Sequence, residues 1–217
     1  MEHEIKTFFG RRKGRALSGA KKELLFLHMK EFELAFPVRS DGRRMTLEIG
    51  YGSGEHLVEY AKKRPGELFI GTEAFVNGNA AMVRALAVAG LTNVKIFPDD
   101  ANLLFGRLPE EAFAQIFILY PDPWPKSRHE ARRMVSPERV EIFAKLLSPG
   151  GRILVVSDHP VYIPHTLRVM QESGLFKWTA RQSTDFARPP VDWETTRYEQ
   201  KAIREGRMPI YLEFVKK

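Results

Sequence analysis

The sequence predicts an α/β fold, a parallel β-sheet with helices on both faces. Two observations predict it. Five short apolar segments alternate with helix-like segments between residues 45 and 158. The fourth of them, residues 113–121, is almost wholly apolar, as expected of a strand that is covered on both faces. With 217 residues and 43% hydrophobic content, the chain is long enough for one large domain. We expect this domain over residues 41–217, after a basic arm and helix over residues 1–40.

Each element is justified by its local pattern. The apolar segments 45–50, 68–73, 94–98, 113–121 and 152–158 are expected strands, because they are short and bounded by turn residues. Amphipathic residues 55–64 predict a helix that Pro65 and Gly66 end, and alanine-rich residues 79–90 predict a helix that Gly90 closes. A further helix begins at residue 137. Residues 187–193 suit a surface loop, and residues 208–217 a last strand.

Composition excludes several classes of protein. The chain has no cysteine, so it forms neither disulfides nor thiolate metal sites, and its six histidines show no metal-ligand spacing. No apolar run is long enough to span a membrane, and the first residues lack the apolar region of a secretory signal. We therefore expect a cytoplasmic protein with no metal.

Basic residues gather in two clusters, within a net charge of +7 that favours a polyanionic partner. We expect both clusters to contact a nucleic-acid backbone, although a solvated tail or face is the alternative for each. If residues 128–133 were helical, their arginines would share one face. The clusters are Arg11, Arg12, Lys13 and Arg15 in the arm, and Arg128, His129, Arg132 and Arg133 after the fourth strand.

Acidic residues stand at, or just past, the ends of successive expected strands. In open α/β sheets, ligands bind beyond the carboxyl ends of the strands. Five strands that each deliver an acid to the same edge predict a binding site there. These acids are Glu48, Glu73, Asp99 with Asp100, Asp122 and Asp158.

The glycine-rich turn "LEIGYGSGEHL" distinguishes between cofactors. Gly50, Gly52 and Gly54 lie between strand and helix, but a dinucleotide motif would need its third glycine at position 55, which is glutamate. Glu48 within the motif would oppose a pyrophosphate, whereas it could attract a sulfonium or amino cation. The turn therefore predicts S-adenosylmethionine, although a purely structural turn is the alternative.

Two further acids suit the rest of this cofactor. Glu73 follows the second strand, where an acid binds ribose hydroxyls in nucleotide-binding α/β folds. Asp100 could accept a hydrogen bond from the adenine amino group, and Asp99 competes for that role. A surface acid is the alternative for Glu73.

The ordered segments "EIGYGSG", "GTE", "DDA", "YPDPWPKSRH…RR", "SD" and "TRYE" together resemble the bacterial tRNA (guanine-N7-)-methyltransferase family. The similarity runs from the arm to about Glu199. It implies a Rossmann-like class I S-adenosylmethionine-dependent methyltransferase fold with a mostly parallel, seven-stranded sheet. It also implies methylation of N7 of a guanine in the tRNA variable loop, nucleotide 46. Tyr51, Ala74, Phe75 and Ser157 depart from the family pattern but remove no functional group.

The resemblance assigns Asp122 to cofactor contact and catalysis, and physical chemistry supports this. Three prolines between residues 121 and 125 stiffen the loop that holds Asp122. Guanine N7 carries a lone pair and no proton, so alignment and charge stabilisation matter more than a general base. Trp124 is either a core anchor or a contact to base or cofactor. The resemblance further implies that the substrate is bound by Lys126, Asp158, Thr196, Arg197, Tyr198 and Glu199; for each the alternative is a surface ion pair.

Two other functions fit the same residues. The chain could be an α/β methyltransferase that acts on another RNA or, despite its basic clusters, a small molecule. It could also be a non-catalytic RNA-binding protein that keeps the cofactor fold. The sequence leaves monomer or homodimer open.

Overall fold

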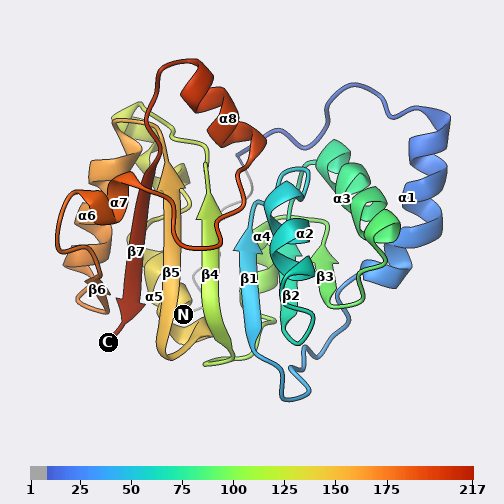
Figure 1. Ribbon diagram of the computed structural model, residues 1–217, viewed down its shortest axis with the longest axis horizontal. Helices are drawn as coiled ribbons and strands as arrows, with labels where there is room; N and C mark the ends of the chain where they lie inside the picture. The colour runs from blue at the N-terminus through green and yellow to red at the C-terminus, as the bar shows by residue number, and fades with distance from the viewer. Residues whose placement is uncertain (1–8) are drawn as a thin grey trace.

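The computed structural model describes residues 9–217 and contains one sheet of seven strands, in the order β3-β2-β1-β4-β5-β7-β6 (Figure 1). Strands β1 to β5 are parallel, and β7 runs antiparallel to both β5 and β6. The expected mostly parallel, seven-stranded sheet is confirmed. The strands are β1 (Met45–Ile49), β2 (Leu68–Thr72), β3 (Val94–Phe97), β4 (Phe113–Leu119), β5 (Leu147–Ser157), β6 (Phe176–Trp178) and β7 (Ile210–Lys216).

Helices cover both faces of the sheet, as the alternating pattern predicts. On one face α1, α2 and α3 bury a cluster that includes Phe32, Leu57 and Met82; on the other, α4, α5 and α6 pack over sheet residues such as Leu47 and Ile116. Every residue of β1 and β2 is buried, which explains their apolar composition. The helices are α1 (Gly19–Phe32), α2 (Glu55–Lys62), α3 (Val76–Ala89), α4 (Ala101–Phe105), the 3-10 helix η1 (Ser127–Arg132), α5 (Pro137–Leu146), α6 (Tyr162–Glu172), α7 (Thr184–Ala187) and α8 (Arg197–Arg204).

Helix α8 lies above the carboxyl ends of β4 and β5, and the segment that leads to it crosses the sheet (Figure 1). Within this segment, residues 188–193 form a surface loop as expected, while Ala187 ends α7; Trp193 packs against Tyr211 of β7 with the ring centres 5.4 Å apart. Together with Phe117 and Val156, these rings form a third apolar cluster. This cluster holds the start of α8 close to the carboxyl edge of the sheet.

Two expected boundaries differ from the structure by more than two residues. Strand β5 begins at Leu147, five residues earlier than expected, because the chain enters it directly from α5 and turns at Gly150, whose φ is 71°. Helix α3 begins at Val76, three residues earlier than expected, and Gly90 ends it in a left-handed conformation as predicted.

Over residues 9–217, no helix is both long and apolar enough to cross a membrane. The same part of the chain contains no group of three or more His, Asp or Glu side chains placed to hold a metal ion.

Candidate active site

A cavity of about 400 Å³ opens at the carboxyl edge of the sheet, beyond the ends of β1, β2 and β4. Its wall includes Gly50, Gly52, Glu73, Asp100 and Asp122, which are far apart in the sequence. The structure thus brings together five of the seven residues expected to contact the cofactor. It does not bring Glu48 or Gly54 to the cavity wall.

The glycine turn between β1 and α2 needs its glycines for backbone conformation and close approach. Gly52 has a φ of 60°, and its carbonyl oxygen would lie only 2.2 Å from a side-chain carbon added at Gly78 of α3. Gly54 has a φ of 85° and packs against Met82, so it shapes the turn from behind the cavity. The turn is therefore tightly packed on α3 while its front faces the cavity.

Glu73 is fixed by backbone donors. One of its carboxylate oxygens accepts a hydrogen bond from Gly52 N at 2.9 Å, and the other from Phe75 N at 2.9 Å. Burial raises the pKa of Glu73, while these two donors lower it. Each carboxylate oxygen can accept a second hydrogen bond, so Glu73 can still bind hydroxyl groups.

Asp99 and Asp100 both line the cavity. Asp100 is only 5% exposed and caps α4, where its carboxylate accepts hydrogen bonds from Asn102 N and Nδ2. Asp99 forms an ion pair with Arg12 of the arm, at 2.7 Å. Asp100 is thus held within the fold, whereas Asp99 is already engaged by a cation.

Asp122 lies in the loop that follows β4, between two aromatic residues with unusual backbone conformations. Tyr120 has a φ of 51° and Trp124 a φ of 40°, in the left-handed region that bulky residues rarely adopt. Asp122 remains open to solvent, and partial burial raises the pKa of its carboxyl group. Tyr198 of α8 faces Tyr120, with ring centres 6.4 Å apart. Aromatic side chains therefore flank the acid at the cavity mouth.

Glu48 differs from expectation because its side chain points away from the cavity. It is 2% exposed, and His56 Nδ1 of α2 donates a hydrogen bond to its carboxylate at 2.7 Å. Alternate residues of a strand point to opposite faces, and Leu47 and Ile49 occupy the face covered by α4 to α6. Glu48 therefore faces α2, the helix that follows the glycine turn.

Arg133 is a correction to the expected RNA-contacting cluster. It is only 4% exposed, and its guanidinium donates hydrogen bonds to the carbonyl oxygens of Pro123 and Trp124. Residues 127–132 form a 3-10 helix, so Arg132 does not share a face with Arg128 as it would in an α-helix, and Arg133 lies just beyond this helix. The prediction that Arg133 contacts a phosphate is wrong, because its side chain is turned into the fold.

The "TRYE" segment also differs in part from expectation. Thr196 caps α8 by accepting a hydrogen bond from Glu199 N, and both residues are buried. The Glu199 carboxylate accepts hydrogen bonds from Trp193 Nε1 at 2.7 Å and from the Tyr211 hydroxyl at 2.5 Å. Only Arg197 and Tyr198 of this segment reach the cavity wall, and Arg197 also pairs with Glu55. Thr196 and Glu199 hold the helix rather than line the cavity.

Two other expected substrate contacts lie outside the cavity wall. Asp158 follows β5 and forms an ion pair with Arg207 at 2.6 Å, and Lys126 is exposed on the loop before η1.

The basic arm contributes to the cavity. Phe9, Gly10 and Arg11 line it, and the arm is tied to the start of α3 by hydrogen bonds such as Val76 N to Arg12 O at 3.0 Å. Arg132 also lines the cavity, and its guanidinium lies 4.7 Å from the Phe9 ring centre. The exposed members of the two basic clusters are Arg11, Arg12, Lys13, Arg15 and Arg128, while His129 is half-buried against Trp124.

The residues of the cavity wall that the pattern of the sequence did not single out include Phe9, Asn102, Tyr120 and Arg139. Asn102 donates to Asp100, and Arg139 Nε donates to Asn102 Oδ1 at 2.9 Å. The position of Asn102, two residues after an acid at a strand end, was a usable signal of a capped helix start. The sequence carries no signal that Arg139 lines the cavity, since a lone arginine in a helix is ordinarily exposed.

Comparison with known proteins places this chain in a family. Residues 42–212 match the model of a family described as "Putative methyltransferase". The tRNA (guanine-N(7)-)-methyltransferase of Azorhizobium caulinodans is 40% identical over 97% of this chain and 95% of its own. That of Ruegeria pomeroyi is 47% identical over 80% of this chain and 73% of its own.

Among solved structures, the 16S rRNA methyltransferase KamB shares the fold, with a TM-score of 0.54 and 17% identity over 94% of this chain and 95% of its own. TrmN from Thermus thermophilus has a TM-score of 0.56 and 17% identity, over 91% of this chain and 48% of its own. At this level of identity, the similarity shows a shared methyltransferase fold. The near-full-length similarity to the curated relatives goes further, and the chain belongs to the bacterial tRNA (guanine-N7-)-methyltransferase family.

Proposed function

We propose that the chain transfers the methyl group of S-adenosylmethionine to N7 of a guanine in the tRNA variable loop, nucleotide 46. The observation that carries this proposal is the convergence of Glu73, Asp100 and Asp122 on one cavity whose mouth is flanked by aromatic and basic side chains. Acids suit a cationic methyl donor, and aromatic rings suit a purine.

The residues present fit S-adenosylmethionine. Gly50 and Gly52 expose backbone on the cavity wall, Glu73 keeps acceptor capacity for ribose hydroxyls, and Asp100 is positioned to accept from an amino group. This cofactor supplies an electrophilic methyl group bonded to a sulfonium. The acids of the wall suit its positive charge.

Asp122 is the proposed catalytic residue. Guanine N7 has no proton to lose, so the enzyme has to align the base and stabilise the positive charge that moves onto the purine. The prolines around Asp122 limit its motion, and its partly desolvated carboxylate, with a raised pKa, interacts more strongly with a nearby cation than it would in water. Tyr198 and Trp124 offer flat apolar surfaces beside it.

Substrate contacts are proposed along the same edge of the molecule. Lys126 and Arg128 are exposed near the cavity mouth and suit phosphates, as do the exposed basic residues of the arm. Asp158 suits the N1 and N2 donors of guanine, provided that its ion pair with Arg207 opens.

Methylation of two tRNA transcripts with labelled S-adenosylmethionine tests this function. One transcript carries guanine at nucleotide 46, and the other carries adenine there and is otherwise identical. We expect label in the first only, at a site that becomes cleavable by aniline after borohydride reduction, as N7-methylguanine does. Label at another nucleotide, or equal label in both transcripts, would replace this function with that of a different RNA methyltransferase.

A further inference from the structure

The loop that carries Asp122 rests on the buried guanidinium of Arg133. Arg133 Nε lies 3.1 Å from the Pro123 carbonyl oxygen and 3.3 Å from that of Trp124, and Nη2 lies 3.0 Å from the latter. Across residues 9–217, no carboxylate lies within ion-pairing distance of this side chain. The N–H groups of a buried guanidinium need acceptors, and here the carbonyl oxygens of Pro123 and Trp124 supply them.

The loop needs such support because its own backbone is strained and poor in donors. Tyr120 and Trp124 hold φ angles of 51° and 40°, and Pro121, Pro123 and Pro125 have no N–H groups. Strained residues of this kind persist only where the surrounding structure holds them in place. Tyr120 N donates to Val156 O of β5 at 2.8 Å, which fixes the start of the loop. Arg133 fixes the other end.

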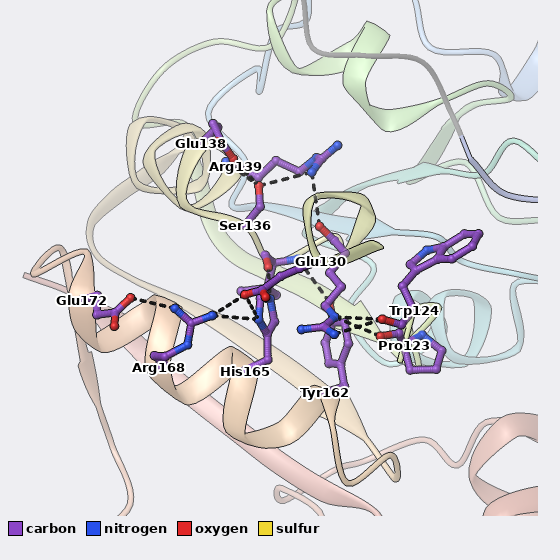
Figure 2. A network of polar contacts seen from close by, with 12 residues as sticks. Pro123, Trp124, Glu130, Ser136, Glu138, Arg139, Tyr162, His165, Arg168 and Glu172 are labelled. Atoms are coloured by element: carbon purple, nitrogen blue, oxygen red, sulfur yellow. Dashed lines mark hydrogen bonds and ion pairs between the residues drawn. The ribbon is translucent and has the colours of Figure 1, made fainter. Parts of the chain in front are cut away.

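Arg133 is itself held by a second buried arginine, Arg139, which Figure 2 shows beside Ser136. Arg139 Nη1 donates to the Arg133 carbonyl oxygen at 3.2 Å and to Ser136 Oγ at 3.2 Å. Arg139 Nε donates to Asn102, which in turn donates to Asp100 at 3.0 Å. A chain of hydrogen bonds that passes through Asn102, Arg139 and Arg133 therefore links Asp100 on the cavity wall to the carbonyl oxygens of Pro123 and Trp124.

We propose that Arg133 is a positioning residue for the methyl transfer: it holds the loop so that Asp122 stays at the cavity mouth. This proposal rests on the proposed function, since it gives Asp122 a catalytic task. It separates two adjacent arginines that look alike in the sequence. Arg132 is half-exposed, lines the cavity and lies against Phe9 and Trp124, whereas Arg133 faces inward.

Arg133→Ala and Arg133→Lys test the role, with Arg168→Ala as the control. Arg168 lies on the neighbouring helix α6, is exposed and pairs with Glu130 and Glu172. We expect both Arg133 variants to lower kcat by about 100-fold, the size of effect that a misplaced catalytic group produces. The Kd for tRNA, its salt dependence and the Kd for S-adenosylmethionine should change less than about twofold, because no ligand contact is lost. Arg168→Ala should keep the parental kcat.

Fluorine NMR of 5-fluorotryptophan-labelled protein reports on the loop itself. The chain has three tryptophans, so Trp124→Phe assigns the Trp124 signal. We expect Arg133→Lys, which keeps the charge but not the two-pronged donor, to shift or broaden this signal, and Arg168→Ala to leave it unchanged. If Arg133→Ala does not fold, Arg133→Lys carries the test alone.

Three results would overturn the proposal: a parental kcat, a loss confined to tRNA affinity and its salt slope, or an unchanged Trp124 signal. If the parent protein methylates no guanine N7, the proposed function fails. The fluorine spectrum would still decide whether Arg133 holds the loop.

Discussion

Glu73 shows how a single side chain can serve the fold and a ligand together. Both of its carboxylate oxygens accept backbone N–H groups, one from the glycine turn and one from Phe75. The carboxylate therefore joins β2 to the turn after β1 and keeps free lone pairs toward the cavity.

Replacing Glu73 with glutamine should weaken cofactor binding by about 10- to 100-fold, because one oxygen becomes an amide NH₂ that opposes a backbone donor and cannot accept a hydroxyl. Isothermal titration with S-adenosylmethionine measures this. Glu59→Gln is the control, since Glu59 is an exposed residue of α2 that pairs with Lys62. Equal affinity in Glu73→Gln and the parent protein would remove Glu73 from the cofactor site.

Asp122→Asn should separate activity from stability. Turnover should fall about 100-fold or more as the negative charge is lost. Stability should rise at neutral pH, because burial raises the pKa of Asp122 in the folded protein and its charged form is therefore disfavoured there. The gain should shrink as the pH falls toward the pKa of an unfolded aspartate, about 4, where the parent carboxyl also becomes neutral. Tm at pH 7.5 and pH 5 checks the sign, and a lower Tm for Asp122→Asn at pH 7.5 would contradict it.

At the level of single residues, the sequence predicted which residues gather at the edge better than where each side chain points. Glu73, Asp100 and Asp122 line the cavity, since a residue that follows a parallel strand lies at the carboxyl edge almost regardless of detail. Glu48 lies inside a strand, where alternate side chains point to opposite faces of the sheet, and the sequence does not tell which face α2 covers. The direction of the Arg133 side chain depends on the 3-10 geometry of the preceding turn, and the spacing of residues in the sequence does not reveal that geometry.

Helix α8 is an element whose position depends on one buried carboxylate. Glu199 accepts hydrogen bonds from Trp193 on the preceding segment and from Tyr211 on β7. Together with the Thr196 cap, these contacts set where Tyr198 meets the cavity.

Glu199→Ala should therefore destabilise the protein by about 2–4 kcal/mol, since it leaves the buried Tyr211 hydroxyl and the half-buried Trp193 indole N–H without their acceptor. For a chain of this size, Tm should fall by roughly 5 °C or more. Urea denaturation and thermal unfolding measure the two quantities. Lys201→Ala on the exposed face of α8 is the control and should change Tm little. A Glu199→Ala protein as stable as the parent would show that α8 is held by other contacts.

The start of α8 could have been predicted from the sequence. Thr196 followed by Glu199 matches the pattern of a capping box, and the structure shows the Thr196 side chain accepting from Glu199 N. That pattern indicates a helix start rather than a row of ligand contacts. The short helices α4 and α7 are different, because four or five residues give no helical period to detect.

For the whole molecule, the alternation of strands and helices was enough to predict the parallel part of the sheet. Apolar segments that are buried on both faces leave a strong local signal, as β4 does. The order of the strands and the antiparallel insertion of β7 between β5 and β6 depend on contacts between distant residues, and no local pattern encodes them. The resemblance to a known family supplied the number of strands.

The charge of +7 is arranged so that exposed basic residues of the arm and of the loop after β4 lie near the carboxyl edge, beside the cavity. Lys145 and Lys177 are also exposed but lie at the opposite edge, where β5 begins and β6 pairs with the end of β7. Phosphate contacts release counterions, so each contact adds about one unit to the slope of log Kd against log salt.

Replacing Lys126 and Arg128 together with alanine should therefore weaken tRNA binding and reduce the slope of log Kd against log salt by up to about 2. The control replaces Lys145 and Lys177 together, which removes the same charge from the opposite edge. Because screening confines the effect of exposed charges to about 10 Å at 0.1 M salt, the second pair should leave the slope unchanged. Filter binding from 50 to 300 mM potassium chloride measures both slopes. Equal slopes for the two double variants would mean that tRNA responds only to the net charge, and the carboxyl edge would then no longer be the RNA-binding face.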